Sequence, residues 1–131
     1  MKTIYLCPHC HANLNPNVKI VLVASHRRRK GLILLSPQPG NYKFIWDDHL
    51  SEVITEGVKI NFACPVCQAD LQSQANRDFA ELFIDSPDHR PKRVLFSRKH
   101  GTHATFIEKG EVFAGYGADA EDFERKNFFG S

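Results

Sequence analysis

The pattern Cys-Pro-x-Cys-x-Ala-x-Leu occurs twice in this chain, as CPHCHANL at residues 7–14 and as CPVCQADL at residues 64–71. The two copies use all four cysteines of a chain of 131 residues. Two residues between the cysteines let a tight turn direct both sulfur atoms toward one point, and the proline restricts the backbone of that turn. The repeat therefore predicts two turns that each present a pair of thiols.

Two such turns brought together supply four thiolates in a tetrahedron, which is the closed geometry that structural zinc prefers. A closed site has no open position at which to activate water, so we predict a role in folding and not in catalysis. We expect strands at 2–6 and 58–63 to deliver both turns to the same end of one sheet. The predicted zinc ligands are Cys7, Cys10, Cys64 and Cys67.

The paired turns resemble the two knuckles of the zinc-ribbon superfamily, which lie at the ends of β-hairpins. The resemblance covers roughly residues 2–73 and implies that the four cysteines are the metal ligands. The 53 residues between Cys10 and Cys64 exceed the gap of compact ribbons, so the hairpins between the turns are an elaboration. Zinc ribbons commonly bind nucleic acid or bridge the subunits of larger assemblies, and the resemblance implies one of these two partners here.

Three other interpretations of the cysteines remain open. An all-thiolate site also accepts iron, as in rubredoxin-type electron-transfer proteins, although their knuckles usually carry glycine where this chain has His11 and Gln68. A thioredoxin-like motif requires the pair to open a helix, whereas prolines and predicted strands surround both pairs. Two disulfides require an oxidising compartment, and the N-terminal sequence MKTIYLCPHC has no long apolar signal segment. We therefore expect a cytoplasmic protein with zinc, and with iron as the alternative.

Hydrophobic patterning predicts a mainly β protein of antiparallel sheets and hairpins around the four-cysteine site, with at most a short C-terminal helix. The segment 47–57 fits either a helical turn or a loop. We predict one domain over residues 1–131, with an elaborated zinc ribbon at 2–73, additional antiparallel strands at 74–118 and a short helix or tail at 119–131. The predicted strands are 18–25, 31–36, 42–46, 58–63, 78–86, 92–99, 103–110 and 111–117.

Positive charge is concentrated in the first third of the chain. Residues 1–46 contain seven Lys or Arg and no acid, whereas the remainder contains ten Lys or Arg against fifteen acids. Such asymmetry marks a surface for an acidic partner such as nucleic acid, unless the two regions lie side by side and neutralise each other. The sequence HRRRKG forms the predicted tip between the first two of these strands. The predicted binding residues are Arg27, Arg28, Arg29, Lys30, Lys92 and Arg93.

The remaining features predict little specific chemistry. His89, His100 and His103 form a candidate second metal site, but no carboxylate spacing supports it. No nucleotide-binding glycine loop or nucleophile motif occurs, so we expect a protein that is not an enzyme. No apolar run approaches the length of a membrane span, so we expect no membrane partner. A larger protein assembly is the other partner class, with Phe123, Phe128 and Phe129 as candidate contacts; the oligomeric state is open.

Overall fold

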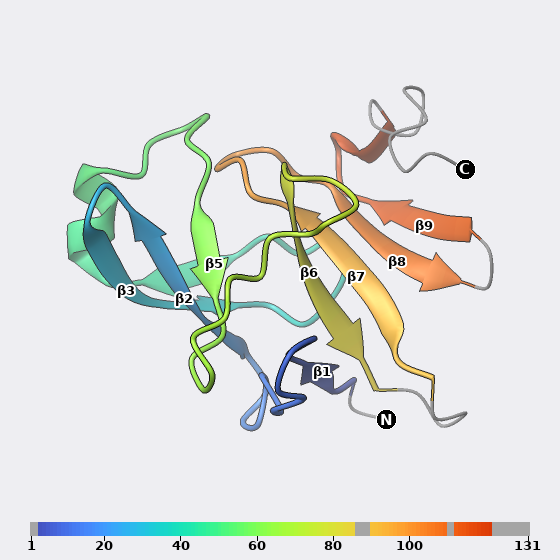
Figure 1. Cartoon of the computed structure of the whole chain (residues 1–131). Coiled ribbons are helices and arrows are strands. Elements are labelled where there is room, and N and C mark those ends of the chain that lie inside the picture. The colour runs from blue at the N-terminus through green and yellow to red at the C-terminus, as the bar shows by residue number, and fades with distance from the viewer. Residues whose placement is uncertain (1–2, 86–89, 110–111, 122–131) are drawn as a thin grey trace.

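A computed structural model describes residues 3–85, 90–109 and 112–121 of the chain (Figure 1). In these residues the strands form two antiparallel sheets, which confirms the predicted mainly β fold. One sheet has five strands in the order β1-β6-β7-β8-β9, and the other has four in the order β4-β3-β2-β5. The strands are β1 Tyr5–Leu6, β2 Ile20–His26, β3 Arg29–Leu35, β4 Phe44–Trp46, β5 Asn61–Ala63, β6 Phe79–Ile84, β7 Lys92–Ser97, β8 Thr105–Lys109 and β9 Val112–Tyr116.

Two short helical segments accompany the sheets. The segment 47–57 contains a 3₁₀ helix, η1, at Asp48–Glu52. A helical turn begins at Ala120 and Glu121, and the rest of the predicted C-terminal helix or tail lies outside the described residues. In the described part of the chain, no helix has the length and apolar character needed to cross a membrane.

The larger of two hydrophobic clusters lies between the two sheets, because each sheet turns one apolar face toward the other. Alternation in β2 buries Ile20, Leu22 and Ala24, and these residues share one cluster with Leu82 and Val94 of the five-stranded sheet. Burial of apolar side chains is the dominant favourable contribution to folding, at roughly 25 cal/mol per Å² of surface. The two sheets are therefore held together by apolar contact as well as by the cysteine turns.

The chain passes from one sheet to the other at each cysteine turn. The first turn follows β1 of the five-stranded sheet and leads to β2 of the four-stranded sheet. The second follows β5 of the four-stranded sheet and leads to Gln72, which pairs with Ala80 in β6. The expectation that both turns lie at the end of one sheet is therefore wrong. Leu14 and Leu71, the last residues of the two repeats, are both buried in the core that the two sheets share. The chain therefore passes through this core as it leaves one sheet for the other.

The β2–β3 hairpin is tighter than the six-residue tip that the sequence predicts. His26 pairs with Arg29, so the turn consists of Arg27 and Arg28 alone. Both residues have a positive φ, 49° and 70°, which is the signature of a type I′ turn. Such turns favour Asn-Gly, because Gly has no Cβ and Asn tolerates the left-handed region better than other side chains do. Two arginines in this turn therefore cost stability.

The first acidic residues after Trp46 fold back on this basic hairpin. Arg29 makes an ion pair with Glu52, and its Nη1 donates to the backbone oxygen of His49 at 3.2 Å. The backbone N–H of Leu32 donates to Asp47 Oδ2 at 3.3 Å. The charge asymmetry of the sequence is thus partly neutralised in space, at the residue directly after the two-residue turn and not within the turn itself.

Candidate metal centre

The fold brings the four cysteines into one cluster. Their sulfur atoms all lie within 4.8 Å of one another, and Cys7 Sγ to Cys67 Sγ and Cys10 Sγ to Cys64 Sγ are both 3.7 Å. A tetrahedron with metal–sulfur bonds of about 2.3 Å places its sulfurs about 3.8 Å apart. In the described residues this is the only group of three or more Cys, His, Asp or Glu side chains arranged to hold a metal ion. The donor set and its spacing therefore fit a tetrathiolate metal centre.

The two turns have the same local structure. In the first, Cys7 O accepts from the N–H of His11 at 2.9 Å, and His11 takes a positive φ of 62°. In the second, Cys64 O accepts from the N–H of Gln68 at 2.9 Å, and Gln68 takes a φ of 64°. The residue after each second cysteine thus occupies the left-handed conformation that glycine adopts with least strain. The absence of glycine there does not change the shape of the turn.

Backbone N–H groups point at the first sulfur of each pair. Cys7 Sγ accepts from His9 at 3.3 Å and from Cys10 at 3.5 Å. Cys64 Sγ accepts from Val66 at 3.3 Å and from Cys67 at 3.5 Å. Hydrogen bonds of this kind stabilise the ionised sulfur that a metal requires.

Burial divides the four sulfurs into two pairs. Cys7 and Cys64 are buried, whereas Cys10 and Cys67 are exposed. Burial raises the pKa of the Cys7 thiol to about 12. Burial acts in the same direction on Cys64, but backbone N–H donors and the neighbouring thiols outweigh it, so the pKa of Cys64 is lowered. Four thiolates at these separations repel one another unless a cation lies between them.

The histidines do not extend the metal centre. His9 and His11 are exposed, and four sulfurs already complete a tetrahedral shell. His103 stacks on the ring of Tyr42 with centroids 4.4 Å apart, and His100 stacks on Trp46 at 5.3 Å. His89, the third member of the candidate second site, lies outside the described residues.

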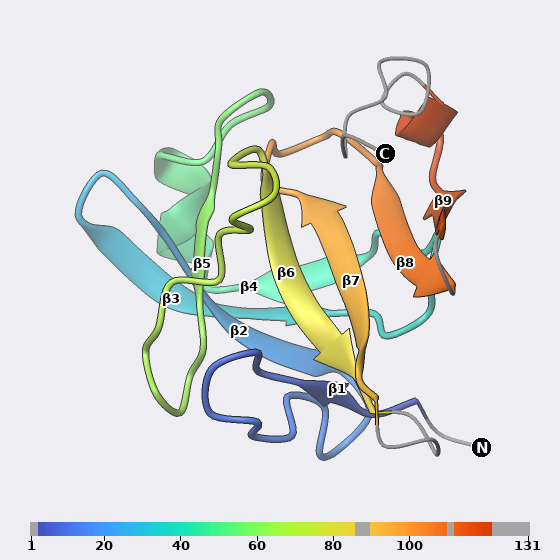
Figure 2. The same ribbon diagram turned by 45° about the vertical axis from the view of Figure 1, so that its right-hand side comes forward.

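The predicted basic residues lie in two separate places. Arg27, Arg28 and Lys30 are exposed at the β2–β3 tip, whereas Lys92 and Arg93 begin β7. Figures 1 and 2 place the tip and the start of β7 at opposite sides of the molecule. The two clusters therefore do not form one face.

Two of the predicted basic residues have partners within the protein. Arg29 is ion-paired with Glu52. Arg93 makes an ion pair with Glu108 at 3.4 Å, and its guanidinium lies 5.2 Å from the centre of the Phe113 ring. Among the described residues, no hydrogen bond or ion pair engages the side chains of Arg27, Arg28 and Lys30, nor that of Lys92. The tip is therefore the larger unpaired basic group of the two.

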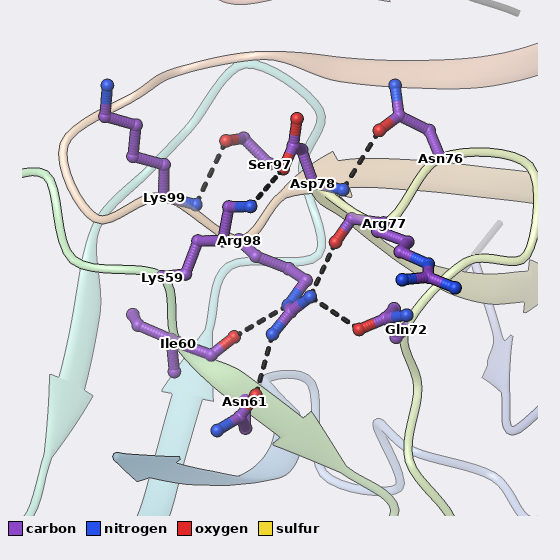
Figure 3. A network of polar contacts seen from close by, with 10 residues as sticks. All are labelled: Lys59, Ile60, Asn61, Gln72, Asn76, Arg77, Asp78, Ser97, Arg98 and Lys99. Atoms are coloured by element: carbon purple, nitrogen blue, oxygen red, sulfur yellow. Dashed lines mark hydrogen bonds and ion pairs between the residues drawn. The ribbon is translucent and has the colours of Figure 1, made fainter. Parts of the chain in front are cut away.

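Arg98 is a buried structural residue that no pattern in the sequence indicates. Its side chain is buried, and Figure 3 shows the guanidinium directed into a set of neutral oxygens. Nε donates to Ile60 O at 3.0 Å, Nη1 to Gln72 Oε1 at 2.8 Å and Arg77 O at 2.5 Å, and Nη2 to Asn61 Oδ1 at 2.7 Å. Arg98 thereby joins β7, the β5 region and the segment after the second cysteine turn. In the sequence Arg98 stands between Ser97 and Lys99, and this polar stretch does not indicate that its middle residue is buried.

Comparisons with protein-family models, with curated proteins and with solved structures find no match to this chain. The resemblance to zinc ribbons therefore extends to the two cysteine turns and carries no family assignment. What is established is a mainly β protein whose four cysteines converge in the manner of a metal-binding site.

Proposed function

We propose that this chain is a non-enzymatic binding module that is stapled by one zinc ion and contacts nucleic acid through the tip of the β2–β3 hairpin. Cys7, Cys10, Cys64 and Cys67 would hold the ion. Bound zinc would supply a closed cross-link between the turns, with no coordination position for water. The two cysteine turns each connect the two sheets, so the cross-link would fix how the sheets pack.

The position of the cluster favours a structural metal, for which zinc is the usual choice. A closed four-sulfur site admits either metal, so the donor set alone does not distinguish them. The centre lies where two segments far apart in the chain meet, which is the position where a metal contributes folding energy. Electron transfer by bound iron is the alternative function, and it is separated from the present proposal by metal analysis.

One observation supports the proposed contact with nucleic acid. Arg27 and Arg28 occupy the two left-handed positions of an exposed turn, where Asn-Gly would be more stable. Residues that break a local rule without a compensating contact commonly mark functional positions. Arginine at a rigid tip presents five donors in a fork that suits phosphate oxygens. Lys30, exposed beside the tip, adds a third positive charge.

The tip is tested by replacing Arg27→Asn and Arg28→Gly together. We expect the free energy of unfolding to rise by about 1 kcal/mol, because both new residues tolerate the left-handed region. Affinity for a fluorescent RNA or DNA oligonucleotide, measured by anisotropy, should fall. With three phosphate contacts, the wild-type affinity should weaken roughly 40-fold between about 50 and 200 mM salt. The slope of log affinity against log salt concentration should fall in the variant to the value for about one phosphate contact.

The matched control removes two exposed lysines away from the tip, Lys19→Asn and Lys99→Asn. It makes the same change in net charge, so it measures the non-specific electrostatic part of binding. Equal loss of affinity in the control and in the tip variant would contradict a specific role for the tip. Absence of binding to both RNA and DNA at low salt would overturn the proposal and leave a protein assembly as the partner to test.

A further inference from the structure

Strand β4 is the last strand of the four-stranded sheet and pairs with β3 on one side. In an antiparallel ladder, successive residues direct their N–H and C=O groups alternately toward one neighbouring strand and the other. The two-residue turn between β2 and β3 sets this alternation and directs Leu34 toward Ile45 of β4. The N–H of Leu32, two residues earlier, points the same way. The backbone groups of Phe44 and Trp46, on either side of Ile45, therefore point away from β3.

This edge of β4 is open. Within the described ranges, no hydrogen bond engages the backbone N–H or C=O of Phe44 or Trp46. The edge is also accessible, because Phe44 is 39% and Ile45 is 57% exposed. An unpaired strand edge is a template on which another strand can add by main-chain hydrogen bonds.

The face of the same sheet that points away from the core is apolar beside this edge. Alternation along the strands places Val21, Val23, Leu32, Leu34 and Ile45 on that face. None of these five side chains belongs to either hydrophobic cluster of the described residues or packs against it. Leu32 is 50% exposed. Adjoining exposed apolar side chains are typical of a surface that contacts another protein.

The sequence of the edge, KFIWD at residues 43–47, is complementary to itself in an antiparallel pairing. When Ile45 lies opposite Ile45 of a second copy, Lys43 lies opposite Asp47 and Phe44 lies opposite Trp46. Opposite charges and aromatic pairs directly across two strands both stabilise the pairing. A shift of two residues in register places Lys43 opposite Ile45 and removes both matches.

The two charged residues of the edge are available for this contact. Lys43 and Asp47 are both exposed. In the part of the chain that the structure describes, the ammonium group of Lys43 has no ion pair. One carboxylate oxygen of Asp47 accepts from the N–H of Leu32 at 3.3 Å, which holds the side chain beside β3 and leaves the second oxygen for a further partner. Asp48, also exposed, adds negative charge at the same end of β4.

We propose that β4 pairs with β4 of a second copy of this chain, antiparallel about a twofold axis at Ile45. Phe44 and Trp46 of each copy supply the main-chain hydrogen bonds, and a Lys43–Asp47 ion pair flanks the axis on each side. Because the same patch serves both copies, the contact closes as a dimer and does not extend into a fibre. The contact is small, so we expect a weak dimer with a dissociation constant on the order of 0.1 mM. It uses neither the metal centre nor the basic tip.

Sedimentation equilibrium of the metal-loaded full chain, from about 0.01 to 1 mM, tests the pairing. The wild type should show a monomer–dimer equilibrium. Ile45→Lys should weaken the dimer at least about tenfold, because it places two like charges opposite each other on the axis. Val112→Lys is the matched control, since Val112 is an apolar residue, 67% exposed, on the outermost strand of the other sheet. It should dimerise like the wild type.

Three results would overturn the proposal. One is a wild type that stays monomeric up to about 1 mM, well above the expected dissociation constant. Another is Ile45→Lys protein that dimerises as well as the wild type. The third is a dimer that Val112→Lys disrupts and Ile45→Lys does not, because the interface would then lie at β9.

A charge exchange tests the register. Lys43→Glu and Asp47→Lys, each alone, place like charges opposite each other on both sides of the axis, so each variant's dimer should weaken about tenfold. An equimolar mixture of the two variants restores opposite charges at both positions and should form a heterodimer with nearly the affinity of the wild type. Both positions are exposed, so the circular dichroism spectra of the variants should match that of the wild type. A mixture that associates no better than either variant alone would overturn the antiparallel pairing about Ile45.

Discussion

Replacing Cys64 by serine is expected to abolish metal binding and to leave the protein largely unfolded at room temperature. Structural zinc contributes on the order of 10 kcal/mol to the folding of small metal-binding domains, which equals the whole stability of a typical domain. Cys64 is buried and accepts two backbone N–H groups, so serine cannot replace it as a ligand or as a thiolate. Circular dichroism during heating, with metal content measured on the same sample, provides the readout.

The control for this variant is Val66→Ser in the same turn. Val66 is 66% exposed and uses only its backbone N–H toward the sulfur, so serine there should leave both the metal and the melting temperature nearly unchanged. Removing the metal from the wild type with a strong chelator should reproduce the effect of Cys64→Ser. A melting curve that is unchanged after verified metal removal would show that the apolar core alone holds the sheets together.

Replacing Arg98 by methionine is expected to lower the free energy of unfolding by about 3 kcal/mol. The change retains a long side chain of similar packing volume but leaves four oxygens around the guanidinium without donors, two of them on the backbone of Ile60 and Arg77. Each buried polar group left unpaired costs about 1–3 kcal/mol, although some of these oxygens will regain water. For a chain of this size the loss corresponds to a fall of roughly 10 °C in melting temperature.

Arg77→Met is the matched control for this substitution. Arg77 takes part in the network through its backbone oxygen, and Figure 3 shows its own guanidinium pointing away from Arg98. The control removes the same chemical group without removing any donor of the network, so its melting temperature should change by less than about 2 °C. If Arg98→Met destabilised the protein no more than Arg77→Met does, the network would not hold the two sheets together. Both variants are to be measured with the metal site saturated.

Several features of the molecule could be predicted because they depend on short stretches of sequence. The cysteine pairs converge because a turn of two residues directs both sulfurs to one point, and the repeat extends to Leu14 and Leu71, whose burial fixes where each turn sits. The hairpin of β2 and β3 follows from two apolar runs of similar length separated by polar residues. Local spacing and alternation carry this information directly.

Other features depend on pairing between distant segments, which local patterns do not specify. The division of the strands into two sheets could not be predicted, because β1 finds its partner β6 more than seventy residues later. Arg98 is buried because Ile60, Asn61 and Gln72 converge on it from other parts of the chain. The two basic clusters are likewise similar in sequence, and only the fold shows that they lie apart.

Whether the four cysteines hold one zinc ion is measured by the metal-to-protein ratio of natively purified protein. Inductively coupled plasma mass spectrometry should find one zinc per chain in a colourless sample, and four thiols should become reactive only after the metal is removed. Protein with one iron per chain and the red colour of a ferric tetrathiolate would make the centre a redox site. Protein with no bound metal and four freely reactive thiols would show that the four cysteines do not form a metal centre.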